Sequence, residues 1–550
     1  MPSKFQEALD ENPHLRDYLT KVEEERGETP EFRENLTRDM ASMEKVNIIY
    51  PVTDPIFVHL NIPPEEKGLY FTIEPPLNSG LKEKVEDIRK KILLKASRTR
   101  TPDEGEEFED KLDGLIDDVT TTYSGLSSIF SFGDGIVRLD EEDMETVRYH
   151  IKKRIMGYGI LEPLLYDPYV EDIHAVALSN LSVLHEVFGL LETNLNFETK
   201  ERLEKYVRSM SNRMGKNVTE SNPITDGALP MGSRVNIIYS KDVSKEGPSF
   251  TIRNFSEEPI TISQIVDWNT LSPKMAAYLW LCLEFDMSMI VSGVTASGKT
   301  TTMNALLPFI GYDQKIYSAE DTPEVNVPQP TWQRLVTRET GPEDSRVELF
   351  DLVKTALRSR PDYIVIGEVR GREGSAAFQA IQTGHPVIST FHASSVDKLI
   401  QRFTGDPINV PIRFMDNLNV CLFQQIIYHE GQILRRCSSV VEILGYSRER
   451  EGVQTRRIFT WDPVKDEHNF IGMNNSYVLE NLIAPKLRFD DRKKIYDELE
   501  KRTEILRKIV EAGITKHEQV AEIFKSYSYG GIENMNRKLA DMRDERGYER

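Results

Sequence analysis

The sequence is poor in cysteine and contains no long apolar run. Its three cysteines, Cys282, Cys421 and Cys437, include no Cys-x-x-Cys pair. We therefore expect neither a disulfide framework nor a zinc site, as suits a reducing compartment. No stretch of about 20 apolar residues occurs, so no transmembrane helix is expected. Residues 1–21 are charged throughout and predict no signal peptide, which favours a cytoplasmic protein.

Basic residues are also scarce relative to acidic ones. The chain of 550 residues has 69 Lys and Arg against 89 Asp and Glu, a formal charge of −20. Such a surface repels phosphate backbones, so nucleic-acid binding is not expected outside a local basic patch. The length allows roughly three domains, and a hydrophobic content of 39% is enough for buried cores.

The first predicted part, residues 1–134, is a charged, variable region. Two strands are expected at residues 46–52 and 56–60, on either side of a turn that contains proline. The acidic stretch around residues 96–112 predicts a solvated linker. This part should thus form a small α/β region plus a linker.

Residues 135–257 predict a second α/β domain, with helices at 142–155 and 199–214. From residue 258 to 550, strands alternate with helices of ten or more residues, as in a parallel sheet built from β-α-β units. The apolar spacing of residues 490–512 predicts a helix that ends at Gly513. The C-terminus is therefore expected to be a helical appendage that serves packing.

Residues 293–300 read Gly-Val-Thr-Ala-Ser-Gly-Lys-Thr, a complete G-x-x-x-x-G-K-[ST] phosphate loop. The apolar run at 287–292 predicts a strand before it, and residues 301–307 predict a helix after it. The free N–H groups and dipole of a helix N-terminus favour a polyphosphate. The residues expected to bind ATP are Gly293, Val294, Thr295, Ala296, Ser297, Gly298, Lys299, Thr300 and Thr301.

Two side chains of this loop have specific expected roles. Lys299 supplies a point charge near the β and γ phosphates, and the Thr300 hydroxyl suits a Mg²⁺ ligand. The alternative is a glycine turn that only joins a strand to a helix.

Three further predicted strands end in polar residues. Residues 315–319 lead into Glu320 and Glu324, residues 363–366 into Gly367 and Glu368, and residues 387–390 into His392. Because ligands bind beyond the carboxyl ends of the strands in a doubly wound sheet, these side chains should converge with the phosphate loop.

The chemistry of phosphoryl transfer assigns roles to these residues. One carboxylate must help hold Mg²⁺, and another must orient or deprotonate water. Glu368 is the candidate for the Mg²⁺, in an atypical Walker B that has Gly367 where aspartate is usual. Glu320 or Glu324 is the candidate for the water, and His392 could contact the γ-phosphate. The alternatives are solvated carboxylates and a hydrogen-bonded structural histidine.

These motifs resemble those of the type II/IV secretion ATPases. The resemblance covers roughly residues 140 to 440, with an Asp box, a Walker B region and a His box in order after the phosphate loop. Within the family, residues 50–59 and 459–466 are similar to the archaeal branch, closest to the archaellum motor ATPase. The four-cysteine zinc module of many bacterial members is missing. The segments that carry the family likeness are residues 157–173, 226–234, 320–324, 357–362, 367–371 and 383–392.

The resemblance implies an α/β fold: a RecA-like ATPase domain, a separate α/β N-terminal domain and C-terminal helices. It implies a homo-hexameric ring in which nucleotide lies between the two domains. Arg234 and Arg253 match the N-terminal arginines that approach its phosphates, where a cation can stabilise charge on the γ-phosphate. A surface salt bridge is the alternative for each arginine.

We therefore expect a Mg²⁺-dependent ATPase that powers assembly, and rotation, of a type IV pilus-like filament. The implied partners are a polytopic membrane platform protein and other archaellum motor subunits, so membrane contact is indirect and no nucleic acid is expected. The alternatives are an ATPase for adhesive pili or protein secretion, a DNA-transfer ATPase, and a nucleotide-gated scaffold with little turnover.

Overall fold

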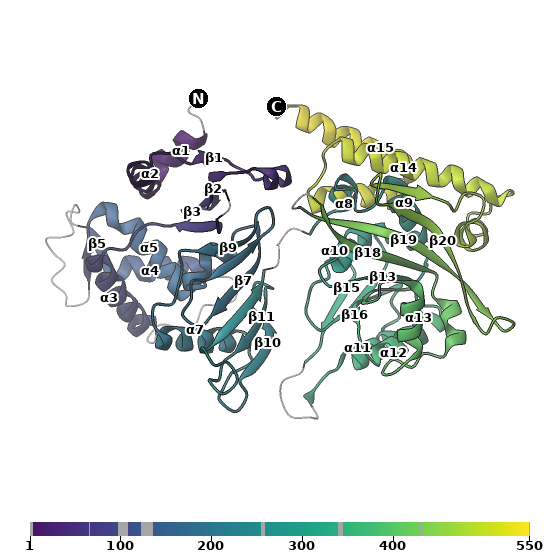
Figure 1. Cartoon of the computed structure of the whole chain (residues 1–550), viewed down its shortest axis with the longest axis horizontal. Coiled ribbons are helices and arrows are strands. Elements are labelled where there is room, and N and C mark those ends of the chain that lie inside the picture. Colours follow the sequence, from purple (N-terminus) through teal and green to yellow (C-terminus); the bar gives the residue numbers. More distant parts are fainter. Residues whose placement is uncertain are drawn as a thin grey trace. The chain divides into compact units, whose positions relative to one another are not determined.

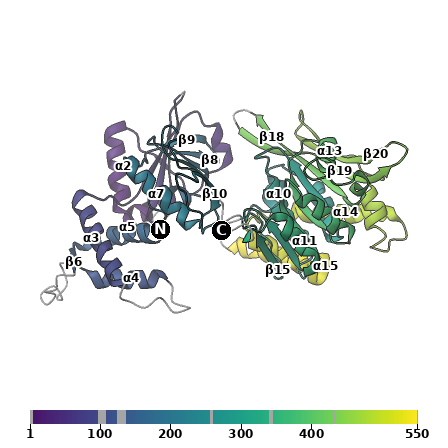
Figure 2. The same ribbon diagram turned by 90° about the horizontal axis from the view of Figure 1, so that it is seen from below.

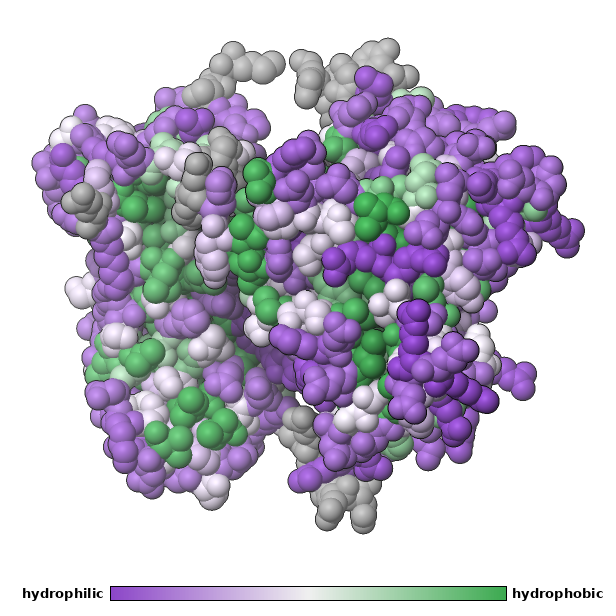
Figure 3. All heavy atoms as spheres, turned by 45° about the vertical axis from the view of Figure 1, so that its right-hand side comes forward, coloured by the Kyte–Doolittle hydropathy of each residue, from purple (hydrophilic) through white to green (hydrophobic). Residues whose placement is uncertain are grey.

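The computed structural model describes residues 4–548, apart from 65, 97–107, 123–135, 255–258, 339–344 and 430–431. The chain divides into two compact units, Met1–Phe255 and Ser256–Arg550 (Figure 1). Among the described residues, no helix is both long and apolar enough to span a membrane. Polar side chains cover most of the face drawn in Figure 3, with apolar ones in scattered patches.

The first unit contains a ten-stranded sheet in the order β1-β2-β3-β4-β9-β8-β7-β12-β11-β10. The strands are β1 (Glu31–Phe32), β2 (Val46–Thr53), β3 (Ile56–Ile62), β4 (Leu69–Ile73), β7 (Val170–Val176), β8 (Ser182–His185), β9 (Gly189–Thr193), β10 (Ile224–Ala228), β11 (Arg234–Ile238) and β12 (Ser249–Arg253). The two strands predicted around the proline turn are confirmed as the antiparallel pair β2 and β3.

The parallel pairing of β4 with β9 joins residues before and after position 134 in one sheet. A buried carboxylate strengthens this junction. Tyr50 of β2 and Tyr70 of β4 each donate a hydrogen bond of 2.6 Å to Asp167, which precedes β7. The division predicted at residue 134 thus separates segments that share a sheet, and it remains a prediction.

Helices cover this sheet and form a cluster of their own. They are α1 (Lys4–Glu11), α2 (Pro13–Arg26), α3 (Ser79–Ala96), α4 (Phe108–Val119), α5 (Glu141–Ile155), α6 (Glu162–Leu165) and α7 (Lys200–Arg213). The predicted helices at 142–155 and 199–214 are confirmed as α5 and α7.

Helices α3, α4 and α5 pack around a core of their own, which also includes residues of β6 (Val137–Leu139) (Figure 2). That short strand pairs in parallel with β5 (Thr120–Thr122). Of the predicted linker at 96–112, residues 97–107 lie outside the described residues. Its last five residues open α4 instead, because Leu112 is the first of the buried residues that α4 turns toward this core.

The second unit is built on a nine-stranded sheet in the order β15-β14-β16-β17-β13-β18-β19-β20-β21. Its strands are β13 (Met289–Gly293), β14 (Ile316–Glu320), β15 (Trp332–Val336), β16 (Tyr363–Val369), β17 (Val387–Phe391), β18 (Val420–His429), β19 (Gln432–Ser447), β20 (Gly452–Asp462) and β21 (Glu467–Phe470). Strands β13 to β18 are parallel, as predicted, whereas β18 to β21 form antiparallel hairpins that the prediction missed.

Helices cover both faces of this sheet. They are α8 (Ile262–Asp267), α9 (Pro273–Glu284), α10 (Lys299–Leu306), α11 (Leu349–Ser359), α12 (Glu373–Gln382), α13 (Val396–Thr404), α14 (Ile495–Glu511) and α15 (His517–Tyr548). Alternate residues of each buried strand supply the two cores: Met289 and Val291 pack with α9 and α14, and Ile290 packs with α11 to α13. Figure 1 shows these helix sets on opposite sides of the sheet. The predicted RecA-like α/β fold class is confirmed.

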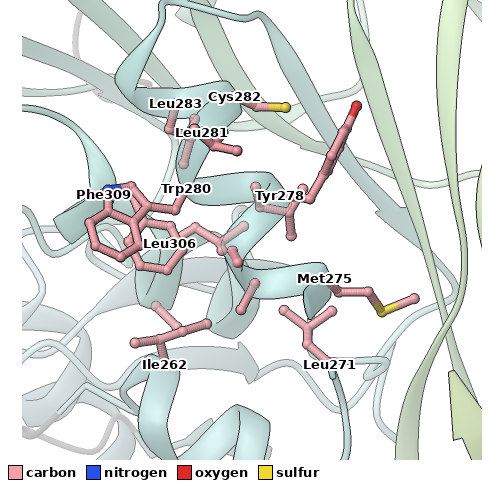
Figure 4. Packing of buried hydrophobic residues seen from close by; sticks show 14 of the residues in the cluster. Ile262, Leu271, Met275, Tyr278, Trp280, Leu281, Cys282, Leu283, Leu306 and Phe309 are labelled. Carbon is pink, nitrogen blue, oxygen red and sulfur yellow. The ribbon is translucent and has the colours of Figure 1, made fainter. Parts of the chain in front are cut away.

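The C-terminal helices belong to the first of these cores. The predicted helix at 490–512 is confirmed as α14, and Gly513 follows it at a φ of 64°. Residues 275–283 of α9 are all buried, and its Trp280 ring stacks on Phe309 at a centroid distance of 5.7 Å (Figure 4). Phe524 of α15 packs edge-on against Trp280 at 5.1 Å. The helical appendage therefore completes the core on this face.

Candidate nucleotide site

The loop after β13 has the backbone of a phosphate cradle. A Cβ at Gly293 would lie 2.6 Å from the backbone oxygen of Gln424, so only glycine fits there. Gly298 has a φ of 85°, which favours glycine, and Ala296 is also left-handed at 60°. Helix α10 begins directly after this turn, at Lys299. The loop thus directs a helix N-terminus and its unpaired N–H groups toward one place.

Side chains of the loop itself hold this conformation. Ser297 Oγ donates to the Val294 carbonyl at 2.8 Å, and Lys299 Nζ donates to the same oxygen at 3.1 Å. Lys299 is buried. The predicted lysine is therefore set inside the loop, next to the helix start.

The other predicted nucleotide-binding residues line the loop and the first turn of α10. Val294, Thr295 and Ala296 are exposed at its tip. Thr300 and Thr301 are half-buried on α10, and the next residue, Thr302, accepts a hydrogen bond of 2.6 Å from Gln424 of β18. The Thr300 hydroxyl is a suitable oxygen ligand for Mg²⁺ because this cation prefers hard oxygen donors.

Glu368 and His392 lie side by side at the ends of β16 and β17. One Glu368 oxygen is 2.8 Å from His392 Nε2, and the other accepts a hydrogen bond of 2.6 Å from Arg370. His392 Nδ1 is 3.4 Å from Lys299 Nζ. Burial and the neighbouring Lys299 lower the pKa of His392, so its imidazole is neutral near pH 7. A carboxylate, an imidazole and the loop lysine are therefore gathered in one chain of contacts.

Hydrogen bonds between the strands hold these groups in place. Ser292 Oγ, at the end of β13, donates to the Ala393 carbonyl at 2.8 Å and accepts from its N–H at 3.1 Å. Thr390 Oγ1 on β17 donates to the Gly367 carbonyl of β16 at 2.7 Å. Three adjacent strand ends are thus fixed relative to one another.

Glu320 is a buried carboxylate at the end of β14, with 1% of its surface exposed. Its Oε1 accepts from the backbone N–H groups of Glu324 and Val325, at 2.7 and 2.6 Å. Its Oε2 has no hydrogen-bond partner among the described residues and lies 3.6 Å from Arg334 Nε. Burial raises the pKa of Glu320 to about 7. This carboxyl can therefore exchange a proton near neutral pH.

Gly367, the glycine of the atypical Walker B, lies against the side chain of Glu320. A Cβ at Gly367 would lie 3.3 Å from Glu320 Cγ. An aspartate there would crowd Glu320 and place a second carboxylate beside it. Gly367 therefore leaves room for the buried Glu320.

Glu324 is half-buried on the loop after Glu320. Asn304 of α10 fixes this loop: its side chain donates to the Glu324 carbonyl at 2.8 Å and accepts from the Asn326 N–H at 3.1 Å. Asn304 thus ties the loop that follows Glu320 and carries Glu324 to α10, the helix of the phosphate loop.

The two predicted arginines lie in the first unit. Arg234 and Arg253 face each other as Cα partners on the antiparallel strands β11 and β12. Arg234 Nε is 3.6 Å from Asp226, and Arg253 is exposed. Arg358 and Arg360, within the family-like segment 357–362, are exposed at the end of α11.

Three further residues touch this site and were not predicted from the sequence. Arg334 approaches Glu320 from β15, Gln424 binds Thr302 from β18, and Arg435 of β19 donates to the Ala296 carbonyl at 3.1 Å. None of them follows a recognisable motif. Only the strand pairing brings them to the site, so no local signal in the sequence could have identified them.

The chain is similar to several known proteins. The family described as type II/IV secretion system protein matches residues 156–463. A protein of Methanocaldococcus jannaschii called uncharacterized protein MJ0900 is 48% identical over 540 residues, 97% of this chain and 98% of its own length. A second protein of that organism, uncharacterized protein MJ1287, is 38% identical over 49% of this chain and 99% of its own length. The Legionella pneumophila ATPase DotB has 18% identity and a TM-score of 0.38, over 66% of this chain and 94% of that chain.

Proposed function

This chain belongs to the type II/IV secretion system protein family, and we propose that it is a Mg²⁺-dependent ATPase that powers filament assembly. The observation that carries the proposal is the gathering of Lys299, Glu368 and His392 beside the phosphate loop. A turn that merely joined a strand to a helix would need none of these three groups.

Each residue of the site has a separate proposed role in ATP hydrolysis. The loop N–H groups and Lys299 bind the phosphates. His392 lies between Lys299 and Glu368 and would contact the terminal phosphate. Glu320 orients the attacking water and accepts its proton, because its Oε2 lacks a hydrogen-bond partner in the described part of the chain. Glu324 is the second candidate for this role.

Thr300 and Glu368 would hold the magnesium ion that accompanies the nucleotide. Both supply the oxygen ligands that this cation prefers, and Glu368 is fixed in place by His392 and Arg370. When bound, the ion offsets the negative charge of the phosphates.

The finer proposal is that six copies form a ring and that Arg234 and Arg253 reach the phosphates when the two units close. Their arrival would stabilise charge on the γ-phosphate and couple hydrolysis to motion. The ring would act on a polytopic membrane platform protein at the cytoplasmic face of the membrane. The likeness of residues 50–59 and 459–466 favours the archaellum, with its other motor subunits as partners and rotation as output. Adhesive pilus assembly and protein secretion are the alternatives within the family.

Steady-state phosphate release tests the enzyme itself. Lys299→Ala and Glu368→Gln should each lower turnover by roughly 100-fold, because each removes a charge at the reacting phosphate. Lys508→Ala and Glu511→Gln, at exposed residues of α14, are the matched controls and should leave the rate unchanged. Negligible turnover in the unmutated chain would favour a nucleotide-gated scaffold and contradict the proposal.

A further inference from the structure

The phosphate loop packs against the hairpin formed by β18 and β19. Arg435 Nε on β19 donates to the Ala296 carbonyl at 3.1 Å, and its Cδ lies 3.3 Å from where a Cβ of Gly298 would be. Gln424 on β18 borders Gly293 with its backbone oxygen and binds Thr302 with its side chain. The loop is therefore packed against this hairpin along its length.

The hydrogen bond from Arg435 reaches a residue of the loop with an unfavourable backbone conformation. Ala296 has a left-handed φ of 60°, which is strained for a residue that carries a Cβ. A hydrogen bond from a charged donor to its carbonyl fixes the orientation of the following peptide unit. The N–H of the same peptide unit, that of Ser297, donates to the Val294 carbonyl at 3.3 Å. If that peptide turned over, this hydrogen bond would be lost and the phosphate loop would change shape.

Arg435 is itself oriented by its neighbour along the strand. Successive side chains of a strand point to opposite faces, so the anchoring of Arg436 decides where Arg435 points. Arg436 makes two hydrogen bonds of 2.7 Å to Asp466, and a third of 3.0 Å to the Trp268 carbonyl. Trp461 donates to the same Asp466 at 2.8 Å. The hydrogen bonds from Arg436 lower the pKa of Asp466 to about 2, so it stays ionised.

We propose that Arg435 is a positioning residue for the phosphate loop, and that Trp461 and Asp466 act through Arg436 to aim it. Trp461 and Asp466 belong to residues 459–466, which have no part in the proposed catalysis. It rests on the proposed nucleotide site and deepens it: the β18–β19 hairpin sets how tightly phosphates bind. The side chain acts through the Ala296 carbonyl and not by direct chemistry on the nucleotide.

Titration of the full-length chain with Mg²⁺ and ADP tests this role by calorimetry. Arg435→Ala should weaken ADP binding roughly tenfold, the cost of one charge-assisted hydrogen bond. Arg435→Lys should recover part of that loss, and Asp466→Asn should produce an intermediate loss. Arg457→Ala is the matched control, since Arg457 is an exposed arginine on the neighbouring β20. Unfolding midpoints of all variants identify any that lose affinity by failing to fold.

Two readouts separate positioning from general damage. Pyrophosphate should compete less well against ADP in Arg435→Ala than in the unmutated chain, because the defect lies in the phosphate loop. Turnover at saturating ATP should fall less than affinity does. Unchanged ADP and pyrophosphate affinity in folded Arg435→Ala would overturn the inference. If the unmutated chain binds ADP but does not hydrolyse ATP, while Arg435→Ala still loses affinity, the inference stands and the proposed enzyme activity fails.

Discussion

The charge of Glu320 changes near neutral pH. Its pKa is raised to about 7 by burial. The carboxyl is therefore protonated below this pH and becomes a base above it. If Glu320 accepts the proton of water, ATP turnover should rise with pH through a midpoint near 7. Glu320→Gln should lower turnover strongly and abolish this rise, as phosphate release between about pH 6 and 8 would show.

The same pKa shift predicts a change of stability with the opposite sign. Unfolding restores the ordinary value of 4.5, so the unfolded chain loses this proton first as pH rises. Stability from the protonated Glu320 is thus complete below about pH 4.5 and is lost as pH approaches 7. Glu320→Gln should remove that decline in denaturant titrations, with Glu324→Gln as the control. For turnover, a rise near pH 7 that persists in Glu320→Gln would contradict the assignment of Glu320 as the group that accepts the proton of water.

Individual residues were predictable where the chemistry is local in the chain. The phosphate loop and the polar ends of β14, β16 and β17 can be read because their spacing follows from the backbone. Arg435 lies far from Ala296 along the sequence and meets it only through the register of β18 and β19. Contacts of that kind depend on which strands pair, and a single sequence does not state it.

At the scale of elements, α14 and α15 are fastened to α9 by a buried arginine. Arg502 of α14 is 1% exposed. It donates hydrogen bonds of 2.7 Å to Glu284 of α9, to Glu498 and to Tyr527 of α15. The guanidinium also lies 4.7 Å from the Trp280 ring centroid. One side chain therefore links three helices.

Loss of this side chain should destabilise the second unit. Arg502→Ala leaves the half-buried Glu284 carboxylate without its buried cation, so the loss should approach, without reaching its upper end, the cost of about 3–5 kcal/mol for breaking a fully buried pair. Chemical unfolding followed by circular dichroism measures the difference. Arg507→Ala, at an exposed arginine of the same helix, should shift the midpoint little. Equal midpoints for Arg502→Ala and Arg507→Ala would show that the buried ion pairs contribute nothing.

Helices with a clear apolar stripe, such as α5, α7 and α14, were predicted well. The hairpins β18 to β21 were missed because the β-α-β rhythm of the preceding residues was extended to the end of the chain. The first five residues of α4 were assigned to the predicted linker because acidic residues dominate that stretch. Only its pairing with α3 and α5 in a shared core shows why it is helical.

At the scale of the molecule, the proposal requires the first unit to take part in hydrolysis. Arg234 and Arg253 are paired across β11 and β12, so both can present their charges from one place on that sheet. Arg234→Ala and Arg253→Ala should each lower ATP turnover at least tenfold and change ADP affinity much less, because an arginine that meets charge on the γ-phosphate acts mainly in the transition state.

Phosphate release and ADP titration on the same samples give both quantities. Arg202→Ala, at an exposed arginine of α7 that pairs with Glu198, is the control. Unchanged turnover in both variants, with the oligomer intact, would remove the first unit from the reaction.

The sequence predicted the α/β class of the whole chain, but it did not predict how its N-terminal part is built in. Residues 46–73 form β2 to β4 and extend the sheet of residues 170–253, with Tyr50 and Tyr70 bonded to Asp167. The charged segments on either side of residues 46–73 favoured a separate N-terminal region over one continuous sheet. Pairing between β4 and β9 joins positions more than a hundred residues apart, which composition does not reveal.

A crystal structure of the full chain with Mg²⁺ and a non-hydrolysable ATP analogue tests the central claim most directly. The account predicts the triphosphate against residues 293–300, with Lys299 on its phosphates and Glu368 and His392 beside the terminal one. A nucleotide bound elsewhere, away from Lys299 and Glu368, would contradict it.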